Sequence, residues 1–371
     1  MGNVESDAGK KNEKSSEGLR YSLSFSILSD EYGPAIEKGT FYAGERYATV
    51  MGQLSFTWGI WLSAKKVRRG HKVTVGLRLY TSIHELPQLL ARIDSIALGY
   101  AGAGSEDSKM NVNGGDSYNL FLKNGLPASG FGLVFNNFIL HTNKGHRLAG
   151  RIELAILPVN PLNILPPAKF ISAVPDFQRL HLNSLDNRVV GSVEVVCGEG
   201  ISLWPIAGTL ALTSPTFAQL INNCLLKGVD PNTIVLKELK GFDASLVRVL
   251  LKALYTGGVP EEIRHLSWER LTDAARLVFI LQPSHHQALI QAIHRAMVEQ
   301  FSGLEDTGTM LMTYRFAQKH GMGILANMNF TSLTARPYEL TVMHGLHMTD
   351  DLDVQEIQKG AQNRMLVKGP L

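Results

Sequence analysis

The sequence predicts an α+β chain of 371 residues in which an antiparallel β-sandwich precedes an α+β domain and a helical C-terminal extension. Three observations lead to this expectation. Apolar and polar residues alternate through residues 19–158, five of the fifteen prolines gather in residues 158–175, and capped amphipathic helices follow from residue 214. Because one core typically takes roughly 100–200 residues, a chain of this length is expected to hold two domains.

The composition is that of an ordinary globular protein. Hydrophobic residues make up 44% of the chain, and the net charge of +3 is small and spread out, so no nucleic-acid partner is expected. The two cysteines, Cys197 and Cys224, are too few for a disulfide framework or a cysteine-rich zinc site. No apolar run approaches the roughly 18 residues of a transmembrane helix, and no secretory signal is evident. We therefore expect a soluble protein of the cytoplasm or nucleus.

Residues 1–18 are predicted to be a disordered tail, because they contain almost no apolar side chains to bury. The chain opens with MGNVES, which fits the N-myristoylation pattern: Gly2 would carry the acyl group, and Ser6 is the small hydroxyl residue that the pattern needs. Gly2 is therefore a lipidation candidate. A membrane is an expected partner only if Gly2 is myristoylated, and a single myristoyl chain gives marginal affinity.

The alternation in residues 19–158 predicts short β-strands with one buried face. It is clearest in LSFSI (23–27), VTVGL (73–77) and IELAI (152–156). Glycine and asparagine interrupt the runs and loops separate them, which is typical of an antiparallel sandwich.

The densest charge cluster of the chain is KKVRRGHK, residues 65–72. Its position between two β runs predicts a solvated hairpin tip. A nuclear-import signal or a patch for an anionic partner is the alternative interpretation.

Residues 159–186 are predicted to be a linker between the two domains. Proline removes backbone donors and stiffens the chain, and both effects suit a spacer. Beyond it, residues 189–196 and 201–206 are rich in β-formers, and Gly198-Glu199-Gly200 between them predicts a hairpin.

Residues 187–300 are predicted to form the α+β domain, and its first helix has clear start signals. Ser214 is a good N-cap, and Pro215 suits the first helical position, where a missing N–H costs nothing. Apolar residues then recur at helical spacing, which predicts one buried face. They are Phe217, Leu220, Ile221, Cys224 and Leu225.

A second helix is expected to begin at Asp243 and to end at the pair Gly257-Gly258, which supplies a residue for a left-handed conformation. The two helices flank a predicted strand at residues 233–239.

The C-terminal extension, residues 301–371, is predicted to be helical in its first part. Ser267 is expected to start a helix before it, and Asp306 starts another that ends at Gly321. Residues 337–371 show no clear periodicity and are predicted to be irregular.

Candidate chemistry is sparse. His285, His286 and His294 lie on a predicted helix without a carboxylate or cysteine nearby, so we interpret them as structural rather than as metal ligands. The glycine pairs of residues 102–104 and 198–200 lack the third glycine or the Lys-Ser/Thr of a phosphate loop, so they are interpreted as turns. No nucleophile elbow, paired carboxylates or Cys-His arrangement stands out. Neither an enzyme nor a cofactor is expected.

The segments SPTF (214–217) and LYTG (254–257) resemble the BTB/POZ fold, and the resemblance covers residues 187–300. It implies a domain that assembles proteins, as a homodimer and in many adaptors on a cullin scaffold. The helices from residue 301 resemble a shortened BACK-like segment.

The chain departs from the BTB pattern in places that matter for assembly. Ser192 replaces a usual aspartate, and Ile206-Ala207 replaces a usual His-Lys/Arg pair. The segment LLKGVD (225–230) lacks the glutamate of the hydrophobic-x-Glu sequence that cullin-binding members carry.

The N-terminal half resembles a MATH (TRAF-like) domain, and MATH followed by BTB is a known order in adaptors. The resemblance rests on strand-like segments in residues 56–62, 73–79, 129–131, 138–139, 148 and 152–154. It implies that this half captures an extended peptide or protein substrate by strand addition and side-chain pockets.

Together the two resemblances imply a substrate-recruiting subunit of a cullin-RING E3 ubiquitin ligase. Phe217, Leu220 and Leu225 are the residues expected to serve BTB assembly or cullin docking, and Tyr118 and Phe131 those expected to capture peptide. These aromatic residues, like Trp58 and Trp61, would otherwise pack in the core. An oligomeric BTB scaffold without ligase activity is the alternative, and the missing glutamate favours it.

Overall fold

The computed structural model shows a chain with both helices and strands, an α+β protein, in two compact units. The first unit combines residues Met1–Asn160 with Phe330–Leu371, and the second is Pro161–Asn329. The structure describes residues 19–38, 42–67, 70–80, 90–101, 108–113, 119–120, 122–123, 126–127, 132–140, 147–157, 160–171, 176–183, 185–188, 192–301, 306–339, 351–365 and 367–368. None of the helices searched among these residues is long and apolar enough to cross a membrane.

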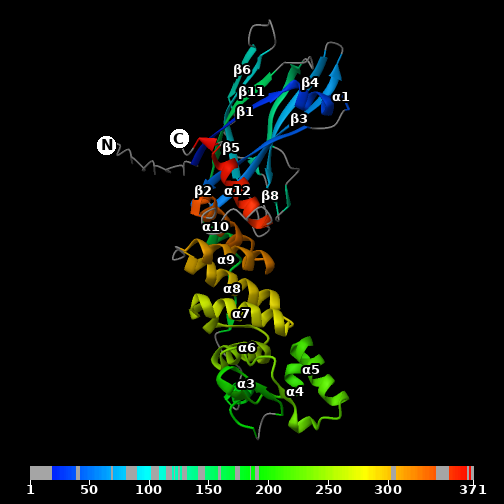
Figure 1. Ribbon diagram of the computed structural model, residues 1–371, viewed down its shortest axis with the longest axis vertical. Helices are drawn as coiled ribbons and strands as arrows, with labels where there is room; N and C mark the ends of the chain where they lie inside the picture. The colour runs from blue at the N-terminus through cyan, green and yellow to red at the C-terminus, as the bar shows by residue number, and fades with distance from the viewer. Residues whose placement is uncertain are drawn as a thin grey trace, which may run out of the picture. The chain divides into compact units, whose positions relative to one another are not determined.

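Two antiparallel sheets make up most of the first unit (Figure 1). One has the order β17-β1-β11-β5-β6, with β7 also paired to β5, and the other has the order β10-β4-β3-β2. The strands of the first sheet are β1 (Leu19–Leu28), β5 (Leu90–Ala101), β6 (Ser108–Asn113), β7 (Asn119–Leu120), β11 (Arg147–Ile156) and β17 (Val367–Lys368). Those of the second are β2 (Tyr42–Met51), β3 (Leu54–Val67), β4 (Gly70–Tyr80) and β10 (Gly132–Leu140), and β8 (Leu122–Lys123) pairs separately with β9 (Leu126–Pro127).

The predicted period of two is confirmed in β1. In β1 the side chains of Leu23, Phe25 and Ile27 are buried and alternate with exposed serines. In β3 Trp58 is fully buried, and its indole N–H donates to the Thr49 hydroxyl at 2.8 Å. Trp58 is therefore a core residue whose one polar atom is satisfied, as a buried tryptophan requires.

The C-terminus contributes two elements to the first unit. The sequence predicts no regular element beyond residue 337, whereas the structure has α12 (Leu352–Met365) and β17 there. Helix α12 packs against β2, and β17 pairs with β1 at Ser22 and Leu23. Only three positions of α12, Val354, Ile357 and Ala361, are apolar and buried. This stripe is too thin to stand out as a sequence pattern.

The proline-rich segment predicted as a linker carries regular elements in the structure. These are α2 (Pro161–Ile164), β12 (Phe170–Ile171) and α3 (Asp176–Asn183). β12 pairs in parallel with β16 (Val259–Pro260), and the Arg295 guanidinium donates to the carbonyl oxygens of Leu162 and Leu165 at 3.1 and 3.3 Å. The segment from Pro161 onward is thus part of the second unit and is hydrogen-bonded to its β16 and α8.

A three-stranded sheet opens the second unit after α3. β13 (Glu194–Val196) pairs antiparallel with β14 (Ser202–Leu203) across the 3-10 turn η1 (Gly198–Gly200), which confirms the predicted hairpin. β13 also pairs in parallel with β15 (Val235–Leu236), a two-residue strand inside the predicted segment 233–239.

Helices make up the rest of the second unit, and α7, α8 and α9 follow one another along it in Figure 1. The helices are α4 (Ala207–Thr213), α5 (Pro215–Leu226), α6 (Ala244–Thr256), α7 (Trp268–Leu281), α8 (His286–Gln300), α9 (Thr307–Lys319) and α10 (Gly323–Thr334). The short 3-10 turns η2 (Pro231–Thr233) and η3 (Glu261–His265) lie between helices. The last residues of α10, from Phe330 on, belong to the first unit.

The predicted helix ends are largely confirmed. Ser214, Asp243 and Asp306 accept hydrogen bonds from the backbone N–H three residues later, and Gly257 ends α6 with φ at +67°. Ser267 occupies the N-cap of α7 but accepts no such bond through its side chain.

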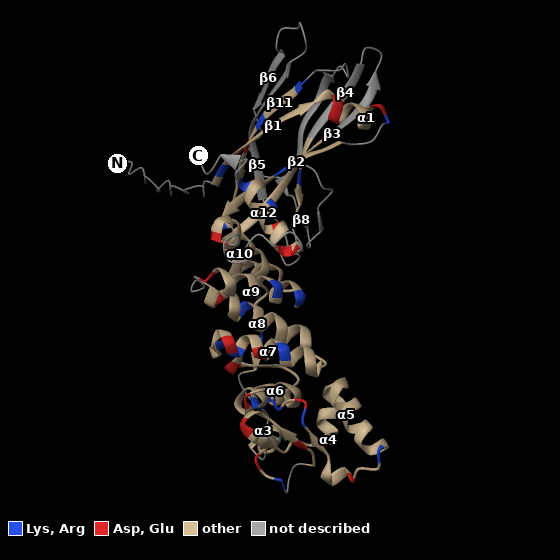
Figure 2. Ribbon diagram, viewed as in Figure 1, with Lys and Arg blue, Asp and Glu red and all other residues tan. Residues whose placement is uncertain are grey.

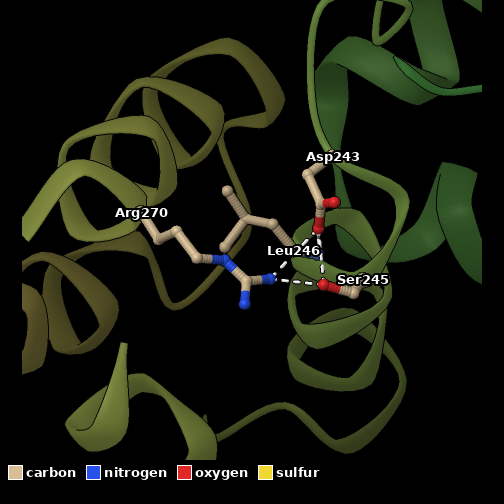
Figure 3. A network of polar contacts seen from close by, with 4 residues as sticks. All are labelled: Asp243, Ser245, Leu246 and Arg270. Atoms are coloured by element: carbon tan, nitrogen blue, oxygen red, sulfur yellow. Dashed lines mark hydrogen bonds and ion pairs between the residues drawn. The ribbon is translucent and has the colours of Figure 1, made fainter. Parts of the chain in front are cut away.

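The N-terminus of α6 is held to α7 by a polar network (Figure 3). The Asp243 carboxylate accepts from Ser245 Oγ at 2.5 Å, from Leu246 N at 2.9 Å and from Arg270 Nη2 at 3.1 Å. The Ser245 hydroxyl bond, the Leu246 N–H and the nearby Arg270 guanidinium together lower the pKa of Asp243. The network is exposed, so we assign it to helix capping rather than to chemistry.

Candidate partner-binding surfaces

The junction of α4 and α5 is fixed to the end of α7 by hydroxyl groups. The fully buried Ser214 side chain accepts from Phe217 N at 3.2 Å and donates to the carbonyl oxygen of Leu281. Two residues later, Thr216 Oγ1 donates to the Ile280 carbonyl at 2.8 Å. The start of α5 is therefore held to the last residues of α7 by these two hydroxyl groups.

The residues predicted to lie on one buried stripe of α5 have different environments. Phe217 is a core residue with 1% of its surface exposed, so it offers no side-chain surface to a partner. Leu220 is half-buried. Leu225, predicted to be buried, is 42% exposed because it lies in the last turn of α5, where the core no longer covers the helix.

Exposed leucines are the main apolar feature of this helix pair. Leu226, next to Leu225, is 86% exposed, and Leu212 near the end of α4 is equally open. We call Leu212, Leu225 and Leu226 the α4–α5 leucines. Leu225 and Leu226 are adjacent in the last turn of α5, whereas Leu212 lies just before its start, so the helix pair has two separate exposed apolar positions.

The backbone N–H groups of the apolar pair Ile206-Ala207, at the start of α4, both have hydrogen-bond partners. Tyr255 Oη accepts from Ile206 N, and Ser192 Oγ accepts from Ala207 N, both at 2.8 Å. Burial raises the pKa of Tyr255, so the phenol stays protonated. Ser192 and Tyr255 thus have a structural role here.

A second candidate surface lies on β2, β3 and β4 in the first unit. Arg46 of β2 and Arg78 of β4 are both register partners of Gly59 in β3, one on each side. The Tyr80 ring fills the space that Gly59 leaves, since a Cβ at residue 59 would lie 2.6 Å from Tyr80 Cε2. The guanidinium carbons of Arg46 and Arg78 lie 4.5 and 4.9 Å from the centre of that ring. We call these three side chains the arginine–tyrosine stack.

The same sheet face has a second ring over a glycine. Trp61 of β3 and Gly76 of β4 are register partners, and a Cβ at residue 76 would lie 2.0 Å from atoms of the indole. Trp61, unlike Trp58, is therefore only partly buried, and its indole lies over Gly76 of the neighbouring strand. A glycine covered by a cross-strand aromatic ring is a known way to stabilise a sheet, and it also leaves a flat aromatic surface.

Several residues predicted from the sequence cannot be placed. Tyr118, Phe131 and Gly2 lie outside the described residues. Of the basic run 65–72, the described residues 65–67 of β3 pair with residues 70–72 of β4, with Val67 opposite Gly70.

Sequence reasoning missed the arginine–tyrosine stack. The one signal available was glycine inside two strand-like runs, at residues 59 and 76, because glycine inside a strand often marks a close approach of another group. Which group approaches depends on strand register, and β2 and β3 are offset by an irregularity between Ala43 and Arg46.

The described charged residues and His294 of the second unit have the following surroundings. Basic and acidic residues are interspersed along its helices (Figure 2). His294 is buried and its Nε2 accepts from Leu325 N at 3.2 Å, while burial lowers its pKa to about 4. Among the residues that the structure describes, no group of three or more metal-ligating side chains is found.

Comparisons with known proteins give little beyond the structure itself. No family model matches the chain, and no curated protein matches it. Among solved structures, the chain is similar to the BTB domain of human gigaxonin. The identity is 19%, the match covers 37% of this chain and 98% of that one, and the TM-score is 0.23.

Proposed function

We propose that this chain is a protein-interaction adaptor, which acts by binding rather than by catalysis, in the cytoplasm or nucleus. The observation that carries this proposal is the set of α4–α5 leucines on a helix pair that Ser214 and Thr216 hold to α7. Burying a leucine side chain against a partner is worth about 2 kcal/mol, so the adjacent Leu225 and Leu226 give a useful contact when the helix pair is already ordered, and Leu212 offers another near the start of α5.

In this proposal the second unit is a BTB-like domain that forms a homodimer, with Leu220 and Leu225 at or beside the contact and Phe217 supporting it from the core. The order of elements supports this, because the β13–β14 hairpin, the α4–α5 pair, β15 and α6 follow one another as the BTB resemblance implies.

The first unit is proposed to be a MATH-like domain that captures an extended segment of a substrate protein. The arginine–tyrosine stack supports this role, because two guanidinium groups beside one ring offer hydrogen-bond donors to a carboxylate and flat surfaces to a peptide. Tyr118 and Phe131 remain predicted contacts of the same peptide. A dimer of such adaptors would bind a multivalent substrate with avidity.

The finer proposal is that the adaptor recruits substrates to a cullin-RING E3 ubiquitin ligase. A scaffold that oligomerises without binding a cullin is the second candidate. One observation favours the scaffold: α5 ends at Leu226, and the chain turns at once through Lys227 and Gly228, whose φ is +77°, with no glutamate in this turn.

The experiment is analytical ultracentrifugation of the full chain, with and without a purified cullin N-terminal domain. We expect a dimer, and we expect Leu225→Asp and Leu226→Asp to shift it toward monomer or to abolish cullin binding. Leu352→Asp, at an exposed apolar position on α12, is the matched control and should change neither.

The outcomes separate the candidates. A dimer that binds the cullin supports the ligase adaptor, and a dimer that ignores it leaves the scaffold. A monomer that ignores the cullin, with neither leucine variant changing any property, would contradict both.

A further inference from the structure

The ends of α7 and α9 bring three rings together on the second unit. The His320 ring, at the C-cap of α9, lies 4.3 Å from the Phe279 ring of α7 and 4.4 Å from the Phe316 ring of α9, measured between ring centres. Met312 precedes Phe316 by four residues and therefore lies on the same side of α9. We call Phe279, Met312, Phe316 and His320 the aromatic patch.

The patch is open to solvent although it is apolar. Met312 is 65% exposed and Phe279 is 38% exposed, while Phe316 and His320 are half-buried. Burial of His320 and the nearby cations Lys319 and Arg276 lower its pKa, so at neutral pH the imidazole is uncharged and behaves as a further ring. Single exposed apolar residues are ordinary, but rings in mutual contact on one surface mark an interaction site.

Cations surround the patch. Arg276 lies one turn before Phe279, and Arg315 and Lys319 lie beside Phe316 on α9. Residues 274–281 and 307–319, which carry the patch, contain no aspartate or glutamate. Asp273 is paired with Arg276 at 3.1 Å, but Arg276 keeps more than half of its side chain exposed. A partner brought here would meet positive potential within a Debye length of about 8 Å.

We infer that the aromatic patch docks a short acidic segment of another protein, with an apolar or aromatic side chain on the rings and carboxylates beside Arg276 and Lys319. The apolar side chain supplies contact area, and the carboxylates supply attraction and orientation. This surface uses residues other than the α4–α5 leucines and the arginine–tyrosine stack, so it goes beyond the proposed function and gives the adaptor another partner.

The test begins with a random-peptide phage library selected on the full chain and counter-selected on the double variant Met312→Glu/Lys319→Glu. We expect the surviving peptides to be acidic and to contain an apolar or aromatic residue. One of them, labelled with fluorescein, is then titrated with the full chain by fluorescence anisotropy at near-physiological salt.

Four variants make this titration specific. Met312→Glu and Lys319→Glu should each weaken binding at least tenfold. Leu180→Glu, which changes an exposed leucine of α3 (68% exposed) in the same way as Met312→Glu, should leave it unchanged. Lys359→Glu, which changes an exposed lysine of α12 in the same way as Lys319→Glu, should also leave it unchanged. Melting curves of all four should match that of the parent chain.

Three results would overturn the inference. One is that counter-selection removes every selected peptide, or that the survivors lack acidic residues. Another is that replacing the peptide's carboxylates by amides changes its affinity less than tenfold. The third is that a labelled oligothymidine of equal length binds as tightly and is equally weakened by Lys319→Glu, which would assign the patch to nucleic acid instead.

Discussion

The Ser214 hydroxyl donates a hydrogen bond to the carbonyl oxygen of Leu281, which joins the start of α5 to the last residue of α7. The same hydroxyl oxygen caps α5 by accepting from Phe217 N. Ser214 is fully buried, so neither the Phe217 amide nor the Leu281 carbonyl has water as an alternative partner at this point.

Ser214→Ala should therefore lower the free energy of unfolding by about 2–3 kcal/mol, the sum of a lost N-cap and an unsatisfied buried carbonyl. Thr216→Ala, which loses one exposed hydrogen bond to Ile280, should cost less than about 1 kcal/mol. Urea midpoints of both variants and of Ser214→Thr, which keeps the hydroxyl, check this. Equal losses for Ser214→Ala and Thr216→Ala would contradict the assigned roles.

The Trp61 indole over Gly76 predicts that a methyl group cannot be added to this strand without moving the ring. Gly76→Ala should destabilise the protein by about 1–3 kcal/mol through overpacking. Gly208→Ala, at an exposed position of α4, is the control: its Cβ would meet nothing within 4 Å, and a helical alanine should stabilise by up to about 1 kcal/mol.

A double-variant cycle separates the clash from other effects of Gly76→Ala. When Trp61 is already alanine, the same glycine substitution should cost little, because the ring that it displaces is gone. Thermal midpoints of the four proteins measure this. Additive losses would mean that the ring does not oppose the methyl group.

Local chemistry explains why parts of the fold could be predicted. The helix ends depend on contacts between residues that are close in sequence, as at Ser214, Asp243, Asp306 and Gly257. Capping side chains and a glycine in the left-handed conformation therefore predict a helix end without knowledge of the rest of the fold. The exposure of Leu225 could not be predicted in this way, because helical spacing says which side a residue faces and not where the core ends.

The surfaces proposed to bind partners depend on long-range geometry. Arg46, Arg78 and Tyr80 meet only because two strand pairings bring them to either side of Gly59, and the sequence does not give those registers. In the same way Phe279 and His320 are 41 positions apart and touch through helix packing. Exposed residues of this kind also lack the periodicity that identifies a core.

His294 predicts a pH dependence of stability. Its folded-state pKa of about 4 lies below the ordinary value of 6.5, because burial disfavours the charged ring. Between these values the unfolded chain binds a proton that the folded chain does not, so the free energy of unfolding falls as the pH falls through this window, by about 3 kcal/mol in total. Above pH 6.5 this contribution is fully present.

His294→Gln should flatten this dependence, since an amide oxygen can still accept from Leu325 N and does not titrate. His286→Gln, at an exposed position on the same helix, should leave the dependence of the parent chain in place. Urea midpoints at pH 7 and pH 4.5 give the comparison. The assignment fails if the His294 variant is as acid-sensitive as the parent.

The packing of α12 on β2 predicts that the last residues of the chain stabilise the first unit. Ile357 is fully buried there, so Ile357→Ala should cost about 2–4 kcal/mol through lost burial and a cavity. Hydrogen exchange followed by mass spectrometry should then show faster exchange of amides in residues 42–51, whereas peptides from α6 and α7 should exchange as in the parent chain, because opening is local to a cooperative unit. Leu352→Ala, at an exposed position of the same helix, should change neither region. Unchanged exchange in β2 after Ile357→Ala would mean that α12 does not support this sheet, and the C-terminal segment would then have to be assigned outside the first unit.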